Sequence, residues 1–126
     1  MEFPENLKYS KEHTWAMLTG DVATIGITDF AQSELGEIVY VDLPRIGQVF
    51  KQGEVFGSVE AIKTVSDLFM PISGSVIGSN PRLKGEPTLI NNTPFADGWI
   101  VKAKVATKSE FDTLLSASEY KTSVNA

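Results

Sequence analysis

Residues 47–78 read GQVFKQGEVFGSVEAIKTVSDLFMPISGSVIG, with Lys63 between two runs of β-prone residues. Three glycines precede this lysine, and a proline and two glycines follow it (Gly47, Gly53, Gly57, Pro71, Gly74 and Gly78). Short apolar runs interrupted by Gly and Pro are typical of β-hairpins. The pattern therefore predicts that Lys63 is displayed to solvent at a hairpin tip, with aliphatic neighbours holding the tip by packing.

A lysine in a turn is most often only a solvated charge, so its neighbours matter. Glu60 lies three residues before Lys63, and Asp67 lies four residues after it. An enzyme could recognise a single amine within such an acidic, extended frame. We interpret Lys63 as a candidate site for covalent attachment of another group.

Length and composition narrow the possible classes. At 126 residues, the chain is expected to form one domain, residues 1–126, which can bury roughly two-thirds of its unfolded surface. The sequence has no cysteine, which excludes disulfides, thiolate metal sites and cysteine nucleophiles.

The charge balance is acidic, with a formal net charge of −5. The basic residues are scattered, whereas nucleic-acid binding needs them clustered. No run has the length of a membrane span, and the first residues lack the pattern of a secretory or organellar leader. We therefore expect a cytoplasmic protein with neither nucleic acid nor membrane as a partner, steered toward basic surfaces on partner enzymes.

The N-terminal half reads as strands around one short helix. We predict strands over 9–17, 22–27 and 37–43, with a tight turn at Gly20-Asp21 between the first two. A helix over 30–35 is expected to begin after the side-chain cap of Thr28-Asp29 and to end at Gly36.

The C-terminal half is predicted to hold one more strand and a final helix. Residues 99–105 alternate apolar and charged side chains, as a half-buried strand does. Residues 83–90 contain Gly85 and Pro87, which leaves at most a partial helical turn there. Thr107 and Glu110 have capping-box spacing ahead of a final helix whose apolar face would be Phe111, Leu114 and Leu115. The fold class predicted is mainly β: a two-sheet β-sandwich with short helices after the second strand and at the C-terminus.

Four blocks in order along the chain resemble the glycine cleavage system H-protein family, within the lipoyl/biotinyl carriers. They are residues 7–15 (LKYSKEHTW), 23–44, 57–67 (GSVEAIKTVSD, around Lys63) and 89–100. Biotinyl domains typically carry methionines beside the lysine, where this chain has Ile62 and Thr64. Lipoyl domains of 2-oxoacid dehydrogenases usually have an Asp-Lys-Ala core within a longer chain.

The resemblance implies a barrel-sandwich hybrid fold and a non-catalytic carrier with lipoate attached to Lys63. Such a carrier would take an aminomethyl group from a pyridoxal-phosphate-dependent glycine decarboxylase to a tetrahydrofolate-dependent aminomethyltransferase. A dihydrolipoamide dehydrogenase would then reoxidise the arm, and a lipoyl ligase or transferase would attach it. The implied role belongs to glycine catabolism and one-carbon metabolism, with no catalytic residue in this chain.

A carboxylate beside a groove could pair with the cationic amine of the loaded arm, because charge-assisted contacts are the strong ones. The candidates for this arm groove are Glu12, Ser66 and Asp67. In the family pattern the residue before the tryptophan of the first block is commonly glutamate and helps hold the amine. This chain has Thr14 there, which leaves Glu12 as the candidate substitute.

Three alternatives stay open at the level of sequence. The first is an H-like carrier that relays lipoyl groups to another lipoate-dependent pathway, and the second is a biotin carrier domain. The third is a small hydrolase using Glu12, His13 and Asp67, although no nucleophile motif accompanies them. We expect His13 to be structural, Trp15 and Trp99 to belong to the core, and no metal site, because the carboxylate and histidine spacing matches no ligand motif.

Overall fold

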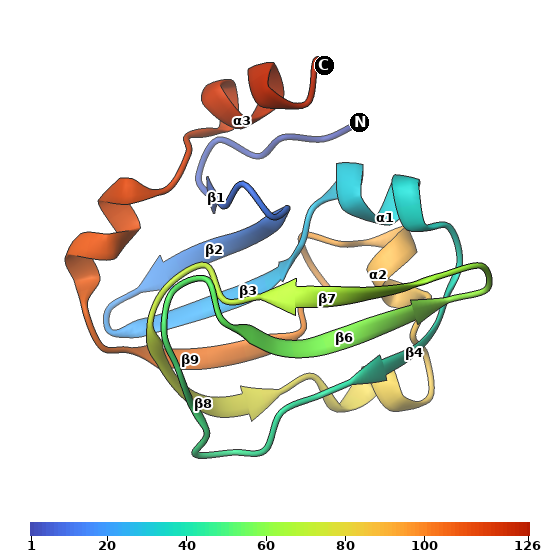
Figure 1. The fold of residues 1–126 in the computed structure, drawn as a ribbon, viewed down its shortest axis with the longest axis horizontal. Coiled ribbons are helices and arrows are strands. Elements are labelled where there is room, and N and C mark those ends of the chain that lie inside the picture. The colour runs from blue at the N-terminus through green and yellow to red at the C-terminus, as the bar shows by residue number, and fades with distance from the viewer.

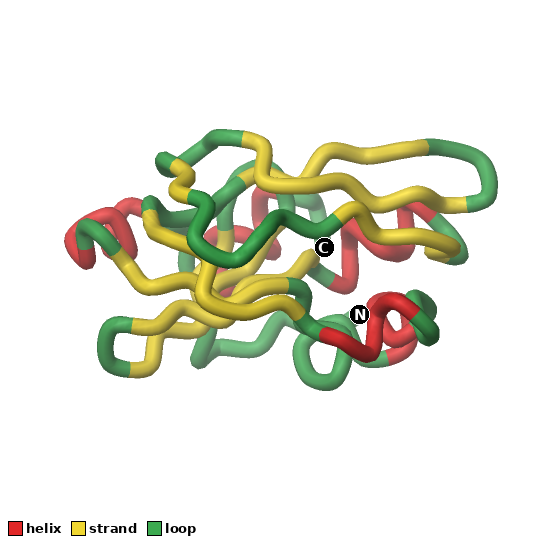
Figure 2. Tube along the Cα trace, turned by 90° about the horizontal axis from the view of Figure 1, so that it is seen from below, coloured by secondary structure: helices red, strands yellow, loops and turns green.

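Two antiparallel sheets form the body of the computed structural model, which describes residues 1–126 (Figure 1). The six-stranded sheet has the order β1-β2-β3-β9-β8-β5, and the three-stranded sheet has the order β4-β6-β7. The strands are β1 (Lys8–Tyr9), β2 (Thr14–Thr19), β3 (Val22–Ile27), β4 (Ile38–Asp42), β5 (Val49–Phe50), β6 (Val55–Ala61), β7 (Val65–Phe69), β8 (Gly74–Ser79) and β9 (Val101–Val105). The edge-on view of Figure 2 shows the strands in two layers.

Short helices sit at the margins of these sheets. The α-helices are α1 (Asp29–Leu35), α2 (Leu89–Asn92) and α3 (Ala117–Ser123), and the 3-10 helices are η1 (Pro81–Lys84) and η2 (Lys108–Thr113). Helix α1 begins as predicted, because the Thr28 hydroxyl accepts a hydrogen bond from Ala31 N at 3.1 Å. It ends at Gly36, whose positive φ of 81° suits a residue without a Cβ.

The main core lies between the two sheets. The strands supply it by alternation: in β9, Val101 and Ala103 are buried while Lys102 and Lys104 face solvent. Ile25 of β3 meets buried residues of the smaller sheet such as Val59 and Leu68 in one cluster. The predicted two-sheet, mainly β architecture is confirmed, and the sheets do not close into a barrel.

A second, smaller core lies at the β1–β2 edge of the six-stranded sheet. Helix α3 and the N-terminal segment pack there, around Tyr9, Trp15 and Tyr120, all fully buried. The rings of Tyr9 and Tyr120 stack at 4.8 Å with an 11° interplanar angle. Trp15 is a core residue as predicted, while Trp99 packs half-buried against this cluster, with Lys102 Nζ 5.0 Å from its ring centroid.

The predicted first strand over 9–17 is wrong in its continuity. A turn separates β1 from β2: Ser10 N donates to Thr14 O at 2.8 Å, and His13 N donates to Ser10 O at 3.2 Å. His13 lies in the left-handed region, at φ 70°. Helix α1 therefore follows the third strand rather than the second.

The predicted final helix is also misplaced. Thr107 makes no capping hydrogen bond, and residues 108–113 form a 3-10 helix. The carboxylate of Glu110 instead accepts two hydrogen bonds from Ser73, one from the Ser73 backbone N at 2.7 Å and one from the Ser73 hydroxyl at 2.9 Å. Helix α3 begins after Ser116, which forms the true capping box with Glu119.

Candidate functional site

Lys63 lies in the turn that joins β6 to β7, the turn that projects at one end of the smaller sheet (Figure 1). Two backbone hydrogen bonds fix this turn. Ala61 N donates to Thr64 O at 2.8 Å, and Ile62 N donates to Glu37 O at 3.2 Å. The second bond ties the turn to the residue just before β4, so the tip is anchored to its neighbouring strand.

The lysine itself is exposed and free of ionic partners. The three ion pairs of the chain involve other cations (Arg82–Glu86, Arg82–Asp97 and Lys108–Asp21). The expectation that aliphatic packing holds the tip is wrong: Ile62 is 69% and Val65 is 62% exposed. Because these side chains face solvent, the rigidity of the turn comes from its backbone bonds and from strand pairing.

A pocket of about 270 Å³ opens between helix α1 and strand β7; we call it the α1–β7 pocket. Its walls are apolar (Ile27, Phe30, Ala31, Leu35, Val59 and Leu68), and its polar residues are Glu12, His13, Thr14, Glu34, Ser66 and Asp67. All three sequence-predicted groove candidates, Glu12, Ser66 and Asp67, therefore border a single pocket. Ser66 and Asp67 follow Lys63 on β7 by three and four residues, roughly 10–13 Å at ~3.3 Å per residue.

Thr14 is part of the pocket wall, but its hydroxyl serves the interior. Its Oγ1 donates to Phe69 O at 3.0 Å and lies 2.6 Å from Ser10 Oγ, which therefore donates to it. Thr14 is 1% exposed, whereas Glu12 is exposed to solvent at the rim. Thr14 thus links β2 to β7, and the carboxylate on this side of the pocket comes from Glu12.

His13 joins the pocket to the second core. Its Nδ1 lies 2.8 Å from the Tyr120 hydroxyl, and its ring contacts Phe30 at 5.1 Å between centroids. Burial lowers the pKa of His13, while the nearby carboxylates of Glu12 and Glu34 oppose that shift. The imidazole is therefore mostly neutral near pH 7, since its lowered pKa lies below the ordinary value of 6.5.

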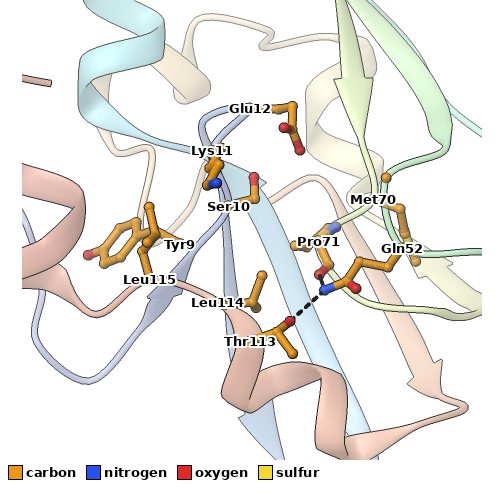
Figure 3. A pocket seen from close by; sticks show the side chains of 11 residues that line it. Tyr9, Ser10, Lys11, Glu12, Gln52, Met70, Pro71, Thr113, Leu114 and Leu115 are labelled. Carbon is orange, nitrogen blue, oxygen red and sulfur yellow. Dashed lines mark hydrogen bonds between the residues drawn. The ribbon is translucent and has the colours of Figure 1, made fainter. Parts of the chain in front are cut away.

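A second hollow, of about 160 Å³, lies beyond Glu12 (Figure 3). Glu12 borders both hollows. In the second one, Gln52 Nε2 donates to Pro71 O and to Thr113 Oγ1, both at 3.1 Å. These bonds tie the turn before β6 to the segment after β7 and to the end of η2, which leads toward α3.

Glu34 is the pocket residue that sequence reasoning missed. It lies on α1, far from the lysine in sequence, and no motif marks it. The one available signal was its position on the predicted helix, beside the apolar residues Ala31 and Leu35. The structure brings together no group of three His, Cys, Asp or Glu side chains that could hold a metal ion. None of its helices combines the length and apolarity needed to cross a membrane.

A two-sheet β-sandwich that displays an unpaired lysine on a rigid hairpin turn, beside an acidic-rimmed apolar pocket, is the arrangement of a swinging-arm carrier. The glycine cleavage H-protein family model matches residues 7–126. The chain belongs to this family, whose members are lipoyl carriers of the glycine cleavage system.

Individual relatives agree over the full length. The glycine cleavage system H protein of Bacteroides fragilis is 51% identical over 126 residues, covering 100% of both chains. That of Staphylococcus carnosus is 50% identical over 121 residues, covering 96% of each. The crystal structure of a glycine cleavage system H protein from Mycobacterium marinum superposes with a TM-score of 0.87 at 33% identity, covering 98% of this chain and 99% of that one. Family membership identifies the chain as a carrier subunit of the glycine cleavage system rather than a biotin carrier domain.

Proposed function

We propose that the Nζ of Lys63 carries lipoate in an amide bond and that the α1–β7 pocket receives the loaded end of this arm. The observation that carries the proposal is the display of an exposed, unpaired lysine on a hydrogen-bonded turn, three residues before Ser66 of the pocket. Bound lipoate would supply a reducible disulfide at the end of a flexible tether. Tethering raises the effective concentration of that group at each partner's active site.

The residues of the chain fit such a group in two respects. The exposed turn leaves Lys63 open to an attaching enzyme, because no salt bridge or buried contact has to break first. The α1–β7 pocket combines apolar walls, suited to the hydrocarbon part of the arm, with carboxylates suited to a cationic amine. Within it, Glu12 and Asp67 would pair with the amine, and Ser66 would offer a hydroxyl beside them.

The partners that follow are the enzymes of the glycine cleavage system. A pyridoxal-phosphate-dependent glycine decarboxylase would supply the aminomethyl group, and a tetrahydrofolate-dependent aminomethyltransferase would remove it. A dihydrolipoamide dehydrogenase would restore the disulfide. Acylation of Lys63 would remove one positive charge and take the formal net charge from −5 to −6, which favours basic docking surfaces on these partners.

The test is the mass of the intact chain after co-expression with a lipoyl ligase. The wild type should gain one lipoyl increment, and Lys63→Arg should gain none, because a guanidinium is not a substrate for acylation. Lys51→Arg is the matched control: Lys51 is also exposed near a β turn, and this variant should still gain the increment. A lipoyl group on the Lys63→Arg chain would place the attachment site elsewhere.

A functional assay separates glycine cleavage from lipoyl relay to another pathway. The lipoylated chain should support exchange of the glycine carboxyl group with bicarbonate by glycine decarboxylase. Lipoylation without any exchange would favour the relay role.

A further inference from the structure

A chain of three hydrogen-bonded side chains runs from the C-terminal helix to the α1–β7 pocket. The hydroxyl of Tyr120, on α3, lies 2.8 Å from His13 Nδ1 and 2.7 Å from Thr28 Oγ1. Tyr120 is fully buried, and Thr28 is 1% exposed. Buried polar groups with no access to water use their hydrogens within the chain, so the direction of each bond can be worked out.

Thr28 sets that direction. Its Oγ1 already accepts the N-cap bond from Ala31 N at 3.1 Å, so the hydroxyl hydrogen needs a separate acceptor. The only other side-chain partner of Thr28 is the Tyr120 oxygen. Thr28 therefore donates to Tyr120, and the hydrogen of Tyr120 is left to point at His13 Nδ1. In the reverse arrangement the Thr28 hydrogen would be buried without an acceptor, which is unfavourable.

The His13 ring is thereby fixed in one tautomer. Since Nδ1 accepts a hydrogen bond, the proton of the neutral imidazole is on Nε2. Nε2 has no hydrogen-bond partner within the chain, and the ring lines the pocket together with Glu12, Glu34 and Asp67. Burial of the ring, which lowers the pKa of His13, is consistent with a neutral imidazole at this place.

We propose that Tyr120 is a positioning residue of the α1–β7 pocket. It holds His13 in the tautomer that carries its proton on Nε2, so the ring offers the pocket a hydrogen-bond donor and no free basic lone pair. The inference rests on the proposed function, in which this pocket receives a cationic amine. In the opposite tautomer, Nε2 would present a lone pair beside that amine. An imidazole (ordinary pKa ~6.5) is a much stronger base than a carboxylate (~4), so this tautomer would withdraw the proton more readily. The amine would then lose its charge and its attraction to Glu12, Glu34 and Asp67.

The direct test uses the unlipoylated wild-type chain, in which His13 is the only histidine. Nitrogen NMR of histidine-labelled protein above the pKa of His13 gives the protonation of each ring nitrogen without ambiguity. The expected spectrum has the proton on Nε2 and an unprotonated, hydrogen-bonded Nδ1. A proton on Nδ1 would overturn the role of Tyr120, and would leave the proposal for Lys63 untouched, because this experiment involves no lipoyl group.

A matched pair of variants tests the consequence for the pocket. Tyr120→Phe removes the donor to His13, while Tyr9→Phe removes a neighbouring buried hydroxyl that donates to Pro4 O at 2.6 Å. Tyr120→Phe should populate the other tautomer and should shorten the lifetime of the loaded aminomethyl group about tenfold, below the ~10²–10⁴-fold of an evolved general base. Tyr9→Phe should change neither quantity.

The pair also separates positioning from general loosening of the second core. Equal lifetimes in the two variants, whether both short or both unchanged, would overturn the inference. Should Tyr120→Phe fail to fold, the wild-type spectrum still decides the tautomer.

Discussion

Thr14 and Glu12 line the same pocket but differ in what each can offer to a bound cation. Thr14 is buried, and its hydroxyl donates a hydrogen bond to Phe69 O and accepts one from Ser10. It therefore has no group left to bind a cation. Glu12, at the rim, is free of any side-chain partner and borders both hollows. Exposure makes Glu12 available but weakens each contact it forms, because solvent screens a surface charge.

We expect Glu12→Gln to shorten the lifetime of the loaded aminomethyl group. Removing one solvent-exposed carboxylate should cost about 1 kcal/mol, or roughly a fivefold faster loss. The lifetime can be followed by intact mass, with Glu5→Gln as a control that makes the same charge change away from the pocket. An unchanged lifetime in Glu12→Gln would remove this residue from the proposed contact.

At the scale of elements, the hairpin that carries Lys63 depends on close approach of β6 to β4. A Cβ added at Gly57, in β6, would clash with the carbonyl oxygen of Asp42, a backbone atom of the neighbouring strand that cannot move alone. Gly78, in β8, has open space around the same position and no positive φ. The two glycines sit in strands of similar length but differ in this one respect.

We therefore expect Gly57→Ala to destabilise the fold by about 2–4 kcal/mol, as overpacking against backbone does. Gly78→Ala should be neutral or stabilising by up to about 1 kcal/mol, because it reduces the entropy of the unfolded chain. Urea denaturation measures both. Equal stabilities would mean that the sheet opens at Gly57 without cost.

The C-terminal helix allows a second comparison between two possible caps. Ser116→Ala removes a capping box and should cost about 1 kcal/mol in the free energy of unfolding. Thr107→Ala, at the start of η2, removes a side chain that makes no cap bond and should stay within about 0.5 kcal/mol. A larger loss at Thr107 would show that its hydroxyl stabilises the chain in another way.

At the scale of the whole molecule, local patterns predicted most strands and α1, because alternation and the Thr28 cap are encoded in neighbouring residues. They misplaced the last helix because Thr107/Glu110 and Ser116/Glu119 have the same spacing, and only the tertiary contact of Glu110 with Ser73 separates them. The position of Lys63 in a hairpin turn could also be predicted, because glycines and short β-prone runs flank it on both sides. Glu34 and the His13–Tyr120 bond could not be predicted, since a partner 107 residues away leaves no local signal.

His13 also gives the whole fold a predictable dependence on pH. Its pKa is lowered in the folded chain by burial, so the unfolded chain binds more protons at this residue as the pH falls through about 6.5. The stability contributed by neutral His13 is therefore complete above that pH and is lost as the pH falls through the folded pKa. The lowered pKa values of Asp21 and Glu119 lie below the ordinary 3.8 and 4.5, outside this window.

We expect the melting temperature of the wild type to fall from about pH 8 to about pH 5, and to fall less in His13→Asn. Asparagine suits this comparison because it tolerates the left-handed φ of 70°, although loss of the ring contacts lowers its melting temperature at every pH. The quantity to compare is the change in melting temperature with pH in each chain. An identical change in both would mean that the pKa of His13 is the same in the folded and unfolded chains.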